Sequence, residues 1–87
     1  DQEERIVDAF VRALGDPNMR VRETVVWALG RMGYKRAVKP LIEAFDYNPY
    51  RVRLLIGRAL SRLTGVDFGT ARRRWWIWYR ANRKMFR

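Results

Sequence analysis

The sequence repeats itself at an offset of 31 residues, so that Val21 and Arg22 recur as Val52 and Arg53. The same offset matches further positions: Phe10 with Leu41, Val11 with Ile42, Ala13 with Ala44, Leu14 with Phe45, Arg20 with Arg51, Ala28 with Ala59, Leu29 with Leu60, and Arg31 with Arg62. Such a period is typical of stacked helical hairpins, because one hairpin cannot bury its apolar face alone. We therefore expect an all-α solenoid of two antiparallel hairpins, about residues 1–34 and 35–65. A C-terminal helix within residues 66–87 completes one folding unit of about five helices.

The spacing of apolar residues predicts helices over about residues 2–14, 19–32, 36–45 and 50–63. Turn-forming runs, Gly-Asp-Pro-Asn at 15–18 and Asp-Tyr-Asn-Pro at 46–49, separate the helices of each hairpin. Gly33 suits the left-handed position after a helix, and Pro40 falls early enough to be tolerated in a first turn. The expected core positions are Ile6, Ala9, Phe10, Ala13, Leu14, Val21, Val25, Ala28, Leu29, Met32, Val38, Leu41, Ile42, Phe45, Val52, Ile56, Ala59, Leu60 and Leu63.

The C-terminal segment leaves the repeat and is rich in arginine and tryptophan. It reads as a loop ending in a helix N-cap at Thr70, followed by a helix to the end of the chain. The expected buried stripe is Ala71, Trp75, Trp78, Tyr79 and Met85, with Phe86 near its edge and with Trp76 and Ile77 outside it. The helix could cap the open end of the solenoid, lie on an anionic membrane surface, or dock onto a partner or a second copy. The helix can combine more than one of these roles.

The composition narrows the classes of function. The net charge of +10 is uneven: −1 over residues 1–33, +5 over 34–65 and +6 over 66–87, which favours an anionic partner for the C-terminal half. The chain has no cysteine or histidine, and its carboxylates show no catalytic spacing, so we expect no enzyme, metal site or cofactor. No apolar run approaches about 18 residues, and the acidic start lacks the layout of a signal peptide, so the cytoplasm is the expected location.

The stretch over residues 21–45, VRETVVWALGRMGYKRAVKPLIEAF, resembles a known repeat. Its Val-Arg pair, Ala-Leu-Gly run, basic turn and Ala-Val-x-Pro-Leu-Ile helix are similar to the short HEAT-like repeat named after phycobilin lyases. The resemblance covers residues 6–65 and implies that Arg22 and Arg53, with Asp16 and Asp46 in the preceding turns, tie each turn to the inner helix. It also implies a concave partner-binding surface on the inner helices, formed by Met19, Arg20, Glu23, Thr24, Trp27 and Arg31, then Tyr50, Arg51, Leu54, Leu55, Arg58 and Arg62.

Exposed aromatic and arginine side chains on one face are typical of protein-binding hot spots, and they also suit phosphates and stacked bases. The leading hypothesis is a non-enzymatic interaction module that binds an acidic protein, or a small subunit of a larger complex. The alternatives are sequence-nonspecific nucleic-acid binding, membrane association through residues 70–87, and self-association. A second, C-terminal basic patch is expected at Arg72, Arg73, Arg74, Trp76, Arg80 and Arg83.

Overall fold

The computed structural model describes residues 1–86, and within that range all regular structure is helical. The elements are α1 (Gln2–Ala13), α2 (Met19–Met32), the 3-10 turn η1 (Lys35–Ala37), α3 (Val38–Ala44), the 3-10 turn η2 (Phe45–Tyr47), α4 (Tyr50–Thr64), α5 (Arg72–Ala81) and the 3-10 turn η3 (Arg83–Met85). The expected all-α solenoid of about five helices is confirmed. The last helix was expected to continue to the end of the chain, and this was wrong: α5 ends at Ala81 and is followed by η3, while residue 87 itself lies outside the described residues.

The helices begin and end at residues suited to these positions. The carboxylate of Asp1 accepts the Glu4 amide at 2.8 Å at the start of α1, and the Asn18 side chain accepts the Arg20 amide at 2.8 Å at the start of α2. Gly33 and Gly65 end α2 and α4 at φ values of 72° and 81°, a left-handed conformation that costs glycine no strain. These boundaries place the two longest helices, α2 and α4, at equivalent points of the repeat.

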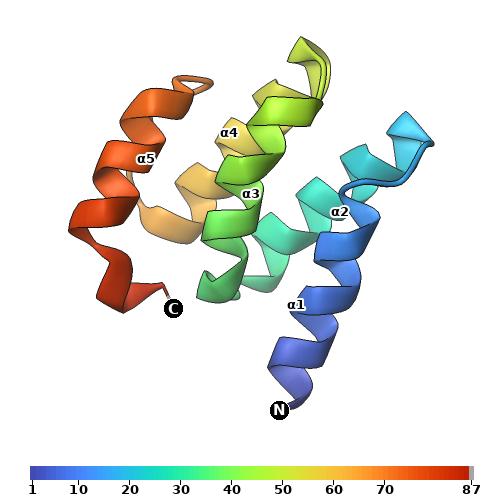
Figure 1. The fold of residues 1–87 in the computed structure, drawn as a ribbon, viewed down its shortest axis with the longest axis horizontal. Helices are drawn as coiled ribbons and strands as arrows, with labels where there is room; N and C mark the ends of the chain where they lie inside the picture. Colours follow the sequence, from blue (N-terminus) through green and yellow to red (C-terminus); the bar gives the residue numbers. More distant parts are fainter. Residues whose placement is uncertain (87) are drawn as a thin grey trace.

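The helices form two layers. α1, α3 and α5 lie in one layer, and α2 and α4, which are fainter in the view, lie behind them (Figure 1). The molecule is a slab with extents of 33 × 33 × 18 Å. α2 packs along α4 at close range, since a Cβ atom added to Gly30 would lie 3.0 Å from the Cα of Ala59. Small residues at this crossing let the two inner helices present one joined surface.

The core predictions hold better for the second hairpin than for the first. All predicted core positions of α4 are buried, as are Val38, Leu41 and Ile42 of α3 and Phe45 of η2. In the first hairpin Leu14, Val25 and Leu29 are buried, but Val7 and Val26, which the helical stripe did not include, are buried as well. The remaining predicted core positions of α1 and α2 are wholly or partly exposed: Ile6, Ala9, Phe10, Ala13, Val21, Ala28 and Met32. The prediction was wrong for Ala9, which is exposed. The other six are only partly buried, and Phe10, Ala13 and Val21 among them pack against the core.

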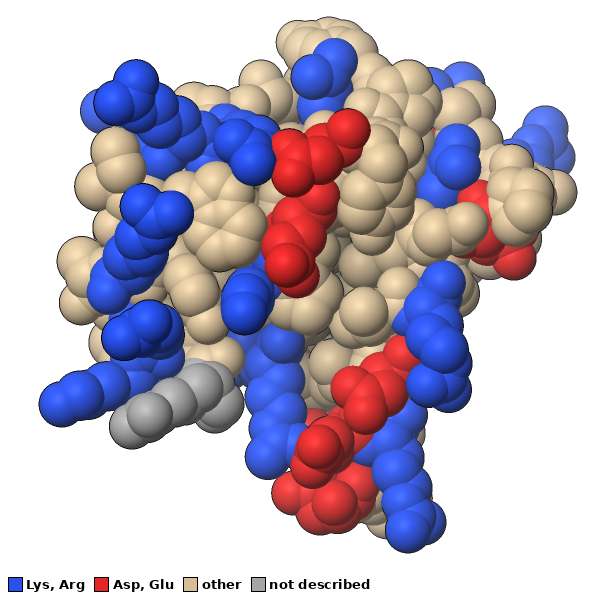
Figure 2. Space-filling model, in the orientation of Figure 1, with Lys and Arg blue, Asp and Glu red and all other residues tan. Residues whose placement is uncertain are grey.

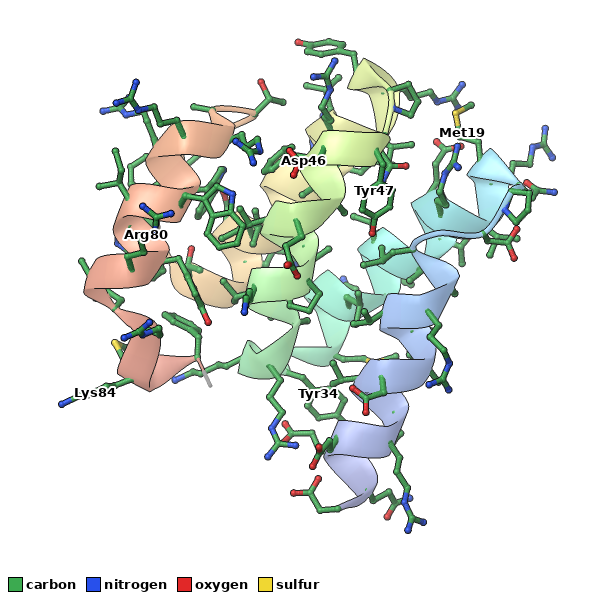
Figure 3. The ribbon with its side chains drawn as sticks, in the orientation of Figure 1. Met19, Tyr34, Asp46, Tyr47, Arg80 and Lys84 are labelled. Atoms are coloured by element: carbon green, nitrogen blue, oxygen red, sulfur yellow. The ribbon has the colours of Figure 1, made fainter. Side chains whose placement is uncertain are left out.

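The third predicted helix, over residues 36–45, is shorter than expected and has a 3-10 turn at each end. Pro40 lies in its first turn, as the sequence predicted. Proline has no amide hydrogen, so the carbonyl of Arg36 cannot receive an α-helical bond from residue 40. The chain therefore takes the tighter η1 turn, in which the Ala37 amide donates to the Tyr34 carbonyl at 3.0 Å, before α3 begins. Tyr34 lies between α1 and the start of α3 (Figure 3).

α5 closes the second hairpin through aromatic side chains. Trp75 is fully buried, stacks edge-on against Phe68 with centroids 5.0 Å apart, and donates its indole N–H to the Gly69 carbonyl at 2.8 Å. Two expectations were wrong. Thr70 does not cap α5, because Ala71 occupies that position and makes no side-chain bond. Met85 is 57% exposed.

The burial of Phe86 and the exposure of Met85 follow from the end of α5. Asn82 ends the helix by donating its side-chain amide to the Trp78 carbonyl at 2.8 Å. The η3 turn then changes the direction of the chain, so that Phe86 is buried at 3% exposure while Met85 faces solvent. Tyr79 is buried in the same cap.

The loop between α4 and α5 lies directly on Gly57. A Cβ atom added to Gly57 would lie 2.9 Å from the carbonyl carbon of Gly69 and closer still to its oxygen. The same carbonyl accepts the Trp75 indole, so one peptide group joins α4, the loop and α5. Gly57 is therefore required for the approach of the cap to the second hairpin.

Candidate functional site

The inner-helix face of α2 and α4 holds most of the residues that the sequence predicted for partner binding. Arg20, Thr24, Trp27, Arg31, Tyr50, Arg51, Leu54, Arg58 and Arg62 are exposed, and Glu23 and Leu55 are partly buried. Met19 is also partly buried and packs against the core. Trp27 is 61% exposed and Tyr50 is 58% exposed, which is unusual for large aromatic side chains in a small domain.

A hollow of about 250 Å³ lies at the centre of this face, between α2 and α4. We call it the central hollow, and it is lined by Trp27, Gly30, Arg31, Leu55, Arg58, Ala59 and Arg62. The hydrogen and methyl side chains of Gly30 and Ala59 leave room for it, because longer side chains at the crossing would fill the space. Neither residue was predicted to line the surface. In the 31-residue repeat Ala59 corresponds to Ala28 and Gly30 to Ser61, so the repeat gave no sign that Gly30 and Ala59 meet.

The aromatic and charged residues of the central hollow come in two pairs, each four residues apart. Such residues are neighbours on one face of a helix, so Arg31 lies beside Trp27 and Arg62 beside Arg58. The guanidinium of Arg31 lies over the Trp27 ring at 5.3 Å from its centroid, a cation–π contact that leaves its N–H groups free for an acceptor. Arg31, Arg58 and Arg62 make no ion pair with any group of residues 1–86. The hollow is therefore an aromatic and apolar depression rimmed by uncompensated positive charge.

A second hollow, of about 600 Å³, continues the surface toward the loop before α5. It shares Arg58 and Arg62 with the central hollow, and its remaining lining residues are Leu54, Gly57, Ser61, Asp67, Gly69 and Thr70. The carboxylate of Asp67 accepts hydrogen bonds from the Ser61 hydroxyl at 3.2 Å and the Gly69 amide at 2.9 Å, and these bonds use part of its hydrogen-bonding capacity. Ser61 and Asp67 are surface residues that the sequence analysis missed, since they come together only through the loop.

Glu23 and Arg51 connect the inner helices at the other end of this face. The Nε atom of Arg51 donates to the Glu23 carboxylate at 3.0 Å, across α2 and α4. Glu23 was predicted to face a partner, but its side chain is only 18% exposed and is engaged by Arg51. Thr24 also bonds within the protein, donating its hydroxyl to the Arg20 carbonyl at 2.9 Å. Glu23 therefore leaves little negative charge to oppose the arginines of the surface.

Arg22 and Arg53 are partly buried, as expected for structural residues, but neither forms an ion pair with a carboxylate within residues 1–86. Arg22 donates to the backbone carbonyl of Asp16 at 3.1 Å and so does tie the turn to α2. The corresponding expectation for Arg53 and Asp46 was wrong. Asp46 forms an ion pair with Arg72 of α5 instead, because α5 packs beside α3 and brings its first turn to the end of that helix.

Tyr47 follows Asp46 in the same turn. Partial burial raises the pKa of the Tyr47 hydroxyl, the Glu43 carboxylate raises it further, the Arg22 guanidinium opposes this, and Asp46 adds a smaller increase. The side chains of Asp46 and Tyr47 leave the chain at the end of α3 (Figure 3).

The C-terminal basic patch lies over α5. Basic side chains gather there on the outer face, whereas acidic ones gather at the start of α1 and along α3 (Figure 2). Arg72, Arg73, Trp76, Ile77 and Arg80 line an open hollow of about 560 Å³, and Arg83 is exposed near the end of the patch. Lys84 points away from the body of the protein (Figure 3), and Arg80 is exposed on α5.

The aromatic side chains of this patch are mostly committed to the fold. Trp76 is partly buried and packs edge-on against Tyr79 with centroids 5.9 Å apart, and Arg74 lies over the Phe68 ring at 5.5 Å. Ile77, at 59% exposure, is the large apolar side chain that α5 leaves in solvent. No helix in residues 1–86 has the length and apolar character needed to cross a membrane, and no cluster of ligating side chains in that range could hold a metal ion.

The repeat, the hairpin stacking and the paired inner helices agree with one further observation. The sequence model of the family described as HEAT repeats matches residues 1–61. The chain belongs to the HEAT repeat family. No curated protein and no solved structure gives a match to the chain. The likeness of its repeats to the phycobilin-lyase type remains a prediction.

Proposed function

We propose that this HEAT repeat protein is a non-enzymatic interaction module that binds an acidic protein segment across the inner-helix face of α2 and α4. The central hollow carries the proposal, because it joins an exposed tryptophan to three arginines without ion pairs in residues 1–86. Tryptophan and arginine are the residues that most often dominate the energy of protein interfaces.

The charge of the face supports an acidic partner. The carboxylates on or beside it, Glu23 and Asp67, are occupied by Arg51 and by Ser61 with Gly69. A carboxylate on a partner would meet Arg31, Arg58 or Arg62 with no competing group to displace.

The size of the hollow supports a protein side chain as the anchor. A volume of about 250 Å³ is suited to one or two side chains, and its floor of Gly30, Leu55 and Ala59 is largely apolar. A partner segment with an apolar residue flanked by Asp or Glu would fill the hollow and pair with its rim. Binding to nucleic acid uses the same arginines but depends mainly on phosphate contacts.

Binding can be tested with acidic amphipathic peptides selected from a display library, measured by fluorescence anisotropy. The double substitution Trp27→Ala and Arg58→Ala is expected to weaken binding by at least about 100-fold, because it removes two hot-spot side chains. Both side chains are exposed, so circular dichroism and the thermal midpoint should change little. The matched control is Arg80→Ala with Ile77→Ala, two exposed residues of α5 outside this face.

Unchanged affinity in the Trp27 and Arg58 variant would show that another surface binds the peptide. The salt dependence separates the two kinds of partner. Affinity for a single-stranded oligonucleotide should fall steeply and linearly in log salt, at about 0.7 per phosphate contacted, whereas affinity for the peptide should fall less. An oligonucleotide bound more tightly than every peptide at 0.15 M salt would favour nucleic acid as the partner.

A further inference from the structure

The two hairpins differ in the burial of equivalent positions along one side. Six apolar positions are partly exposed in the first hairpin and largely or fully buried in the second. The pairs are Ile6 with Ala37, Phe10 with Leu41, Ala13 with Ala44, Val21 with Val52, Ala28 with Ala59, and Met32 with Leu63. Residue type does not explain the difference at Ala13, Val21 and Ala28, because the same residue occupies the equivalent position of the second hairpin. It comes from what covers each hairpin.

In the second hairpin the equivalent positions of α4 and η1 lie against the first hairpin, whereas α3 is also covered by α4 and α5. α2 packs along α4, α1 contacts η1, and Ala59 meets Gly30 at the crossing of the inner helices. The first hairpin leaves the same stripe partly exposed, with Phe10, Ala13 and Val21 touching the core on one side and no helix of residues 1–86 stacked on the other. We call the six positions Ile6, Phe10, Ala13, Val21, Ala28 and Met32 the N-terminal stacking face. A shallow depression of about 260 Å³ beside them is lined by Arg20, Val21, Thr24 and Val25.

The ion pairs between the two hairpins show the same difference between equivalent positions. Two arginines of the second hairpin reach back to the first: Arg51 pairs with Glu23 at 3.0 Å, and Arg36 pairs with Glu4 at 3.4 Å and with Asp1 at 3.5 Å. The repeat places Arg20 at the position of Arg51 and Arg5 at the position of Arg36. Both are exposed, and neither forms an ion pair within residues 1–86.

We propose that the N-terminal stacking face is a docking site for one further helical hairpin of the HEAT type. The hairpin would stack on α1 and α2 as they stack on α3 and α4. It would carry a glycine or alanine where Gly30 meets Ala59, and carboxylates at the positions of Glu4 and Glu23 to pair with Arg5 and Arg20. A second copy of this chain does not supply such a surface, because α3 and α4 already cover the matching side of its first hairpin.

The docking site is separate from the central hollow, which lies on the other side of α2, between α2 and α4, and does not include Arg20. The test supplies the hairpin as an extension of the chain: residues 1–36 joined to residues 6–87. This junction keeps the 31-residue period, retains the Gly33 turn and places Arg36 at the position of Arg5. The added hairpin brings its own Glu4, Glu23 and Gly30.

The matched control is the same extended chain with Ala28→Glu in the receiving hairpin. Ala28 is partly exposed in the natural chain, so Ala28→Glu there should leave the thermal midpoint nearly unchanged. In the extended chain it would place a carboxylate at the crossing of the inner helices and prevent stacking. Amide hydrogen exchange in the added α2 helix is expected to be slowed by at least about 100-fold relative to the Ala28→Glu control.

Equal exchange rates in the added helices of the extended chain and its control would overturn the proposal. An extended chain that loses the helical content of the natural protein would overturn it equally. Sedimentation velocity of the natural chain tests whether a second copy of the chain occupies the face. Dimers that dissociate on Ala28→Glu would assign the face to a second copy in place of a stacked hairpin.

Discussion

Replacing Gly57 with alanine is expected to destabilise the protein, against the usual effect of removing a glycine from a helix interior. An alanine in an exposed helix stabilises by about 1 kcal/mol relative to glycine. At Gly57 the added methyl group would lie 2.9 Å from the carbonyl carbon of Gly69, which is backbone and cannot rotate away. Overpacking of this kind costs about 1–3 kcal/mol. Moving the loop would also break the 2.8 Å bond from the Trp75 indole, worth about 1 kcal/mol.

These contributions leave a net loss of roughly 1–3 kcal/mol in the free energy of unfolding for Gly57→Ala. For a domain of this size, each 1 kcal/mol lowers the melting temperature by roughly 4–8 °C. Urea denaturation followed by circular dichroism measures the change, and the chemical shift of the Trp75 indole proton reports the movement of the loop. The matched control is Gly15→Ala, since the nearest heavy atom to its new Cβ is 3.7 Å away and its φ is not positive. A Gly57→Ala protein as stable as the natural one would refute the reasoning.

Three further expectations follow from named contacts. A double-mutant cycle on Glu23→Gln and Arg51→Gln should give a coupling energy of about 0.2–1 kcal/mol, because Arg51 is largely exposed. A coupling energy of zero would show that the ion pair does not stabilise the packing of α2 on α4. Ala59→Glu should lower the melting temperature, since the longer side chain overpacks the crossing where Ala59 meets Gly30, and a native melting curve would contradict that packing. Burial and Glu43 raise the pKa of Tyr47, so the folded state holds this proton more tightly than the unfolded state. The resulting stability is present below about pH 10 and is lost as pH rises further, and Tyr47→Phe should flatten that loss in denaturation curves.

The sequence predicted the repeat and most helix bounds because both depend on local patterns. α2 begins and ends where its flanking Asn18 and Gly33 indicated. The errors arise where tertiary contacts decide. The apolar stripe of α1 predicted burial of Ile6 and Phe10, yet a stripe says only which residues are suited to burial. Whether a neighbouring hairpin is present to cover them is not encoded in the helix itself.

The candidate site was predictable in outline and less so in detail. Helical spacing and the resemblance to HEAT-like repeats were enough to place Trp27 and Arg58 on one face. The same reasoning could not show that Arg51 engages Glu23, or that Asp46 pairs with Arg72 in place of Arg53. These contacts depend on the distance between helices that are far apart in sequence, and on the packing of α5 beside α3, for which the repeat offers no precedent.

The close crossing of α2 and α4 at Gly30 and Ala59 has a consequence for the speed of folding. The contacts within each hairpin join segments that are near one another along the chain, so little chain entropy is lost before they form, and helical topologies of this kind fold in microseconds to milliseconds. We expect the crossing to be part of the folding nucleus, because it unites the two longest helices. We expect substitutions there to slow the folding step, whereas substitutions in α1 or α5 should chiefly accelerate unfolding.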